Sequence, residues 1–234
     1  MLFKRPNLYD KLLTLFRLEN GIALHFIQSK SSNNAEIFTA KGSEKIIIPL
    51  KGSAKFQNLK AEEKDIIYVP KGIEYLNISF EKGSVIYVVE APSDIESRAY
   101  VKKFSNAKYI DVGEGCFRRR RYILIDIEDK SSRFLAGYTM CCPGCWGSYP
   151  PHRHNDKHEI FIYFDVDPGF GIQLLIDDGR EEAHVVRDYD VFLVTKGCHP
   201  NVSTPLKGLN YLWVMIAVSG SRDFSAEECY LGPR

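Results

Sequence analysis

Four side chains in the second half of the sequence have the types and the spacing of a metal site. His152 and His154 are two residues apart, so both imidazoles leave the same face of an extended strand. Glu159 follows where a short turn can bring its carboxylate back beside them, and His199 lies further along in a Gly-Cys-His-Pro turn. Three imidazoles and one carboxylate can bind a divalent transition metal inside a β-barrel and leave room for a substrate.

This donor set reduces the number of possible metals but does not identify one. We expect zinc, and the sequence leaves manganese, iron, cobalt and nickel open. Binding requires neutral imidazoles and should weaken as the pH falls through the histidine range. The alternative is a solvent-facing pair, His152 and His154, on an exposed strand. His158 is adjacent to Glu159 and should point the opposite way, so it is left out of the predicted site.

The composition excludes several classes of protein. The 234 residues are 44% hydrophobic, and 31 basic residues nearly balance 30 acidic ones, so we expect no bulk attraction to nucleic acid or acidic membranes. No stretch approaches the roughly 20 apolar residues of a membrane helix, and the N-terminus lacks a secretory signal. We therefore expect a cytoplasmic protein. The basic run 118–121 is interpreted as a strand with alternating arginines, with a phosphate-binding patch as the alternative.

Cys142 and Cys145 have the spacing of a redox pair or of half a zinc knuckle. No second Cys-x-x-Cys completes four thiolates. We predict a tight Pro-Gly turn between them, with thiols that have no chemical role.

Short runs of β-branched and aromatic residues, separated by Gly, Pro, Asn and Asp, dominate the chain and predict an all-β fold of the sandwich or barrel type. Helical periodicity is weak. Only Tyr9–Leu18 and the segment around Ile95–Phe104 could hold a short helix.

One motif occurs twice. Each of the segments 65–75 and 190–199 has an aspartate, an apolar strand and a Lys-Gly turn, which should deliver Tyr75 in one copy and His199 in the other towards a barrel. We infer a duplication in which only the second barrel kept a metal and Glu44 marks a lost ligand position. The predicted domains are 1–108, without a metal motif, and 109–234, with the metal site.

Gly147, His152, His154 and Glu159, followed by Asp190, Gly197 and His199, resemble the two motifs of the cupins. The runs 146–154, 169–173, 197–200 and 211–215 more narrowly resemble the 5-deoxy-glucuronate isomerases of inositol catabolism and the related 5-keto-4-deoxyuronate isomerases of pectin breakdown. Cys198 stands where these enzymes are expected to have an aromatic residue. The resemblance implies a bicupin, with two jelly-roll β-barrels in tandem.

The resemblance also implies a metal-dependent aldose–ketose isomerase that acts on a deoxy-uronic acid, most specifically 5-deoxy-glucuronate. For this reaction we predict Tyr163 or Tyr211 in proton transfer, Gln173 orienting a hydroxyl and Arg222 holding the substrate carboxylate. Packing of the tyrosines in the barrel and a solvated Arg222 are the alternatives.

Two other functions stay open on the sequence. The same metal ligands can bind Fe(II) for a dioxygenase. A sugar-binding cupin without catalysis could also keep the pocket. The only partner expected besides the sugar acid is a second copy of the chain, in a homo-oligomer.

Overall fold

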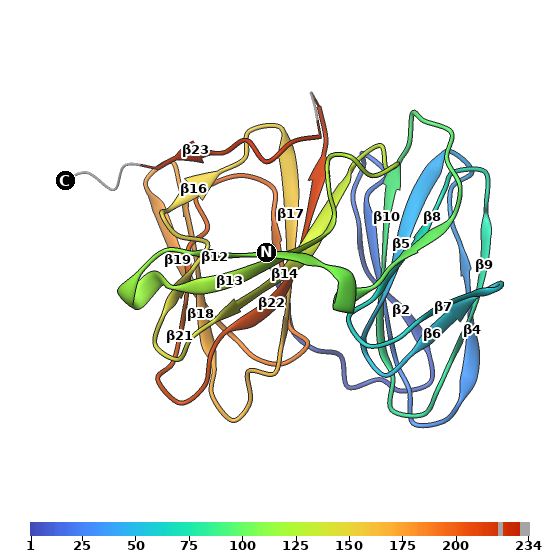
Figure 1. Cartoon of the computed structure of the whole chain (residues 1–234), viewed down its shortest axis with the longest axis horizontal. Coiled ribbons are helices and arrows are strands. Elements are labelled where there is room, and N and C mark those ends of the chain that lie inside the picture. Colours follow the sequence, from blue (N-terminus) through green and yellow to red (C-terminus); the bar gives the residue numbers. More distant parts are fainter. Residues whose placement is uncertain (220–221, 230–234) are drawn as a thin grey trace. The chain divides into compact units, whose positions relative to one another are not determined.

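The computed structural model describes residues 1–219 and 222–229, whose regular secondary structure is almost entirely β-strand (Figure 1). The predicted all-β class is confirmed. Among these residues the helical elements are two short 3-10 turns, η1 (Phe104–Asn106) and η2 (Gly115–Phe117), and no described helix has the length and hydropathy needed to span a bilayer. The helix considered at Tyr9–Leu18 is wrong. Leu12–Arg17 form strand β2, whose backbone groups are satisfied by pairing with a neighbouring strand.

The chain divides into two compact units. The N-terminal unit contains residues 6–107 and 124–133, and the C-terminal unit contains residues 1–5, 108–123 and the described residues from 134 onward. The predicted boundary at 108/109 lies next to the boundary between residues 107 and 108 in the structure. The prediction did not foresee that residues 1–5 belong to the C-terminal unit and residues 124–133 to the N-terminal unit. Residues 1–5 belong to the C-terminal unit because Leu2 and Phe3 pair there with Phe192 and Val191.

The N-terminal unit has two antiparallel sheets. The first has the order β11-β8-β5-β10-β3-β2 and the second β4-β9-β6-β7. Their facing residues form one buried apolar cluster, to which both sheets contribute. The strands are β2 (Leu12–Arg17), β3 (Ala23–Gln28), β4 (Asn33–Phe38), β5 (Ser43–Lys51), β6 (Ala54–Phe56), β7 (Leu59–Ala61), β8 (Ile66–Val69), β9 (Tyr75–Phe80), β10 (Val85–Pro92) and β11 (Tyr100–Lys102).

The C-terminal unit repeats this plan with a seven-stranded sheet, β1-β20-β17-β22-β14-β13-β12, a four-stranded sheet, β15-β21-β18-β19, and the short pair β16-β23. Its apolar core lies mainly on β14, β17, β20 and β22. The strands are β1 (Leu2–Phe3), β12 (Lys108–Val112), β13 (Arg119–Ile125), β14 (Phe134–Cys141), β15 (Trp146–Gly147), β16 (His152–Arg153), β17 (Lys157–Phe164), β18 (Gly171–Asp177), β19 (Arg180–Val186), β20 (Val191–Val194), β21 (Asn201–Ser203), β22 (Asn210–Ala217) and β23 (Glu227–Glu228).

The repeated motif folds alike in the two units. Asp65 and Asp190 are both buried, and each accepts backbone N–H groups at the start of its strand. Gly72 and Gly197 have φ values of 90° and 89°, a conformation that glycine adopts at least cost. The copies differ after the turn. Tyr75 is 40% exposed and donates to Glu36, so it does not enter the barrel.

Strand register identifies the residue that corresponds to Glu159 in the N-terminal unit. Glu159 of β17 lies opposite Val194 of β20, and Lys45 of β5 lies opposite Val69 of β8. The corresponding residue is therefore Lys45 and not Glu44, its neighbour on the other face of the strand. Lys45 is fully buried, and its ammonium donates to three backbone carbonyls, among them Ser43 O at 2.8 Å. The N-terminal barrel thus has a lysine ammonium at the position that corresponds to Glu159.

Glu44 has a structural role in the N-terminal unit. Its buried carboxylate accepts hydrogen bonds from the hydroxyls of Tyr68 (2.7 Å) and Ser131 (2.9 Å) and from the backbone N–H groups of Ser132 (2.8 Å) and Arg133 (2.7 Å). These bonds fasten the 131–133 segment to β5.

We expect Glu44→Ala to lower the free energy of unfolding by about 3–5 kcal/mol, because several buried donors lose their acceptor together. Urea unfolding followed by circular dichroism measures the loss. Glu36→Ala, which removes an exposed carboxylate that accepts a hydrogen bond from the Tyr75 hydroxyl, is the matched control and should cost less than about 1 kcal/mol. A similar cost for both variants would contradict the assigned role of Glu44.

Candidate metal centre

The four predicted ligands come together at one end of the C-terminal unit. His152 belongs to β16, His154 follows it, Glu159 lies in β17, and His199 precedes β21 (Figure 1). The Gly197 turn directs His199 inward. A side chain at this glycine would lie 2.9 Å from Ile176 O, so the tight turn requires glycine both for space and for its positive φ.

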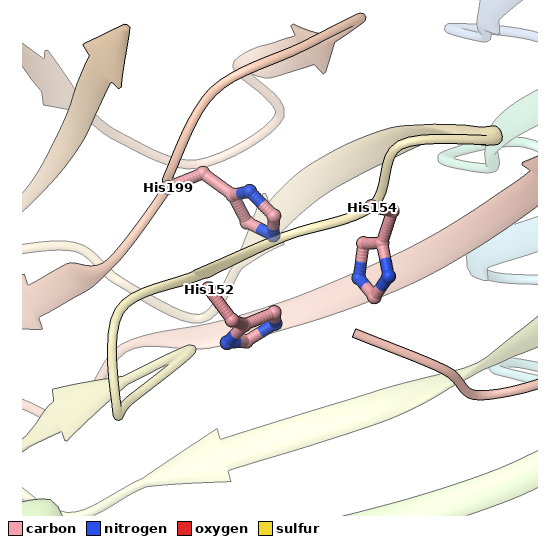
Figure 2. A group of neighbouring side chains, drawn as sticks. All are labelled: His152, His154 and His199. Atoms are coloured by element: carbon pink, nitrogen blue, oxygen red, sulfur yellow. The ribbon is translucent and has the colours of Figure 1, made fainter. Parts of the chain in front are cut away.

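The three imidazoles face a common space. Figure 2 shows His152 and His154 on one segment and His199 on another, with their rings turned towards one another. Their nitrogen ligand atoms all lie within 4.8 Å of one another. Glu159 Oε2 lies 2.9 Å from His199 Nε2 and 3.6 Å from His154 Nε2. Ligand atoms around a tetrahedral zinc are about 3.4 Å apart, so these separations fit a four-ligand metal site.

Hydrogen bonds fix the same tautomer in each histidine. Nδ1 of His152 contacts Pro150 O at 2.8 Å, Nδ1 of His154 contacts Ser225 O at 2.8 Å, and Nδ1 of His199 contacts a backbone carbonyl at 3.0 Å. A carbonyl oxygen can only accept, so each Nδ1 carries the proton. Each Nε2 of the neutral ring then offers a lone pair to a metal, the arrangement usual for histidine ligands.

Two of these candidate ligand atoms are buried without a hydrogen bond in the described part of the chain. His199 Nε2 and Glu159 Oε2 are buried, and neither has a hydrogen-bond partner among the residues that the structure describes. Both are acceptors when His199 is neutral, and they face each other at 2.9 Å. Two buried acceptors at this distance favour a cation that both can bind. The chemistry of the donor set therefore fits a divalent metal.

The surroundings also set the protonation states that a metal needs. Burial, followed by the charge of His199, lowers the pKa of His152 to about 4, so its imidazole is neutral near pH 7. Burial alone would raise the pKa of Glu159, but the contact with His199 and the charges of the neighbouring histidines lower it below its ordinary value. Neither group needs to lose a proton at neutral pH before it binds a cation.

A cavity of about 360 Å³ opens beside the histidines. Its lining includes His152, His154, Glu159 and Tyr211, and its volume falls in the range of small-molecule sites. Gly147 allows the chain to approach here, because a side chain at this position would lie 2.8 Å from the Tyr211 hydroxyl. Burial raises the pKa of Tyr211 above its ordinary value, which keeps the phenol protonated.

The other predicted contacts lie outside the described lining of this cavity. Tyr163 is fully buried and donates to Gln173 Oε1 at 2.6 Å. Gln173 in turn donates to His199 O at 2.8 Å and accepts from Asn201, so it holds the segment that carries His199. Arg222 donates to Phe134 O at 3.1 Å. Tyr163 and Gln173 are thus placed to position His199 rather than to contact a substrate. Arg222 donates a hydrogen bond to a carbonyl outside the cavity lining.

A C-terminal segment, residues 222–229, forms one wall of the cavity through Phe224, Ala226 and Glu228. We call it the strap. Its β23 pairs with β16, and the Lys157 ammonium bonds both Ser225 Oγ and Asp223. A disulfide joins Cys229 at its end to Cys198, the neighbour of His199. The disulfide therefore connects the strap covalently to the turn that carries a predicted ligand.

We expect Cys229→Ser to lower the free energy of unfolding by about 3–4 kcal/mol, the entropy of closing a loop of this length in the unfolded chain. A reductant such as dithiothreitol should cause the same loss in the wild type and none in the variant. Cys116→Ser, which removes an exposed free thiol, is the control. Equal stability of the wild type in oxidising and reducing buffer would count against the disulfide.

Sequence reasoning missed the strap and its disulfide. Cys198 and Cys229 are far apart in the sequence and belong to no recognised spacing, so only the folded chain pairs them. Cys142 and Cys145 form the predicted turn and keep free thiols. The arginines of the basic run alternate between the two faces of the strand, as predicted. The sequence did not predict that Arg119 and Arg121 line the cavity.

Comparison with known proteins identifies the family of this chain. The sequence model of the KduI/IolB family matches residues 20–229. A 5-deoxy-glucuronate isomerase of Geobacillus kaustophilus is 34% identical over 114 residues, which are 44% of this chain and 41% of that protein. A 4-deoxy-L-threo-5-hexosulose-uronate ketol-isomerase of Opitutus terrae is 32% identical over 43% of this chain and 37% of its own length. The chain thus spans less than half the length of these curated relatives in the matched region.

Solved structures support the cupin fold. The crystal structure of an IolB-like protein from Salmonella typhimurium superposes with a TM-score of 0.77 and 19% identity, and covers 88% of this chain and 87% of that one. The family match extends over both units and includes all four predicted metal ligands. The chain belongs to the KduI/IolB family.

Proposed function

We propose that this protein is a metal-dependent aldose–ketose isomerase that acts on a deoxy-uronic acid, with 5-deoxy-glucuronate as the expected substrate. The observation that carries the proposal is the convergence of ring nitrogens of three histidines, and of Glu159, beside a cavity of about 360 Å³. Relatives with the two names given above support the substrate class. Zinc is the metal we expect first, before manganese, iron, cobalt or nickel.

In this proposal His152, His154, Glu159 and His199 hold the metal. When bound, the metal polarises the substrate carbonyl and stabilises the negative charge that develops on it. Gln173 fixes the backbone of the His199 segment through its bond to His199 O. The histidines need no rearrangement to bind, because backbone carbonyls already hold their Nδ1 protons.

Isomerisation also needs a group that carries a proton between neighbouring carbons. The protonated Tyr211 phenol suits a hydrogen-bond donor to a substrate oxygen better than a base. The described carboxylates that line the cavity are those of Glu159 and Glu228. Glu159 belongs to the proposed ligands, so we assign proton transfer to Glu228 on the strap.

The test is incubation of zinc-loaded protein with 5-deoxy-glucuronate while the aldehyde proton is followed by NMR. We expect the aldehyde signal to decline as the ketose forms, and a chelator-treated sample to leave it unchanged. A constant aldehyde signal with metal-loaded protein would contradict the proposed isomerase activity.

Two further measurements, oxygen uptake and sugar-acid binding, separate the competing functions. Oxygen uptake with Fe(II)-loaded protein would favour a dioxygenase, and sugar-acid binding without turnover would favour a sugar-binding cupin. We place the activity in the cytoplasm and in a homo-oligomer, which cell fractionation and light scattering test. In a reducing cytoplasm Cys198 and Cys229 would be thiols, so activity should be compared with and without reductant.

A further inference from the structure

Two arginines of β13 enter the cavity from the side of the seven-stranded sheet. Arg119, Arg120 and Arg121 are consecutive, and residues two apart on a strand share a face. Arg119 and Arg121 line the cavity. Arg120 points the other way, where it forms a two-pronged ion pair with Asp111 at 2.7 and 3.0 Å. The three arginines of β13 are therefore divided between two different surroundings.

Arg119 is held in place without a neutralising charge. Its Nη1 donates to Phe117 O at 3.0 Å and its Nη2 to Tyr149 O at 2.6 Å. Among residues 1–219 and 222–229, no carboxylate lies within ion-pair distance of Arg119. Carbonyl oxygens orient the guanidinium and leave its full positive charge, with three further N–H groups, for another acceptor.

Arg121 adds a second positive charge at the same cavity. Its guanidinium lies 5.6 Å from the ring centre of Phe224, which belongs to the strap and also lines the cavity. The aromatic ring supports the flat side of the cation. With a divalent metal at the histidines, the two arginines and the metal carry four positive charges against the two carboxylates of Glu159 and Glu228. The cavity then favours an anionic ligand.

We infer that Arg119, assisted by Arg121, binds the carboxylate of the sugar acid and gives the site its specificity for acids over neutral sugars. This role was predicted for Arg222, which is bonded to Phe134 O outside the cavity. The inference rests on the proposed function in taking a sugar acid as the ligand. A planar guanidinium can bind a carboxylate with two parallel hydrogen bonds, and its charge remains at any physiological pH.

The experiment measures selectivity for charge and does not depend on turnover. Calorimetry with zinc-loaded protein gives the dissociation constants of D-glucuronate and D-glucose for the wild type and for Arg119→Met, Arg119→Lys and Arg121→Met. We expect the wild type to prefer glucuronate and Arg119→Met to lose roughly 10- to 100-fold of that preference, the effect of a lost charge-assisted bond. Arg119→Lys should keep part of it, because charge remains and the two-pronged geometry is lost.

Arg120→Met is the matched control, since it removes the same charge from the same strand on the opposite face. Its preference for glucuronate should equal that of the wild type. A variant that merely disturbed the fold would weaken glucuronate and glucose alike, so the ratio of the two constants isolates recognition of the carboxylate. An unchanged ratio in Arg119→Met, or no preference for glucuronate in the wild type, would overturn the inference.

The result is independent of the isomerase assignment. If glucuronate selectivity depends on Arg119 but 5-deoxy-glucuronate is not converted, the proposed function fails and the carboxylate site stands. If conversion occurs with a KM that Arg119→Met leaves unchanged, the isomerase stands and the carboxylate site fails.

Discussion

His154→Ala is expected to remove the metal from the purified protein and to reduce kcat/KM for the proposed isomerisation by about 1,000-fold or more. The metal contributes several kcal/mol of charge stabilisation, and each factor of ten in rate corresponds to about 1.4 kcal/mol. Affinity for zinc should fall by at least about 100-fold. Removing a residue that only orients a metal ligand already costs up to about 100-fold, and removing the ligand itself should cost more. Elemental analysis and competition with a chromogenic chelator measure the two quantities.

His184→Ala is the matched control for this variant. His184 lies on β19 in the same unit, bonds Glu182 at 2.9 Å and is not part of the histidine group. It should retain the metal content and the rate of the wild type. Equal metal content in His154→Ala and the wild type would remove His154 from the ligands, and circular dichroism of both variants establishes that each is folded.

Glu228→Gln should lower kcat by about 100- to 10,000-fold, the usual contribution of a positioned acid–base group, while the metal content stays at the wild-type level. Glutamine keeps the size of the side chain and the backbone pairing of β23 with β16, but it cannot accept a proton at neutral pH. A kinetic assay paired with elemental analysis separates loss of proton transfer from loss of metal.

Glu227→Gln tests the same strand with a neighbouring carboxylate. The Glu227 side chain accepts from Arg153 and Asn155 and does not line the cavity in the described structure. Its replacement weakens an exposed ion pair and should change kcat by less than about threefold. If Glu228→Gln turns over at the wild-type rate, another group carries the proton.

The four candidate ligands could be proposed from the sequence because their residue types and most of their spacing are local features. His152 and His154 share a face in any extended strand, and the Lys-Gly pair before His199 favours a turn. The all-β class could be predicted for a similar reason, because short β-branched and aromatic runs separated by Gly, Pro, Asn and Asp are local features of the sequence. The helix considered at Tyr9–Leu18 failed because its residues pair with β3 at a sheet edge, an interaction that short-range periodicity does not report.

The walls of the cavity were not open to prediction in this way, since they depend on which strands become neighbours. Alternation placed Arg119 and Arg121 on one face, but only the folded sheet decides that this face borders the histidines and that Arg222 does not. Glu44 and Lys45 are adjacent in sequence, and only the register with β8 identifies Lys45 as the counterpart of Glu159. Residue types and spacing along the chain predicted the four side chains proposed as metal ligands, and the fold brings them together. Pairing between distant segments decided what the ligands face, because a shift of one residue in register sends each side chain to the opposite side of its strand.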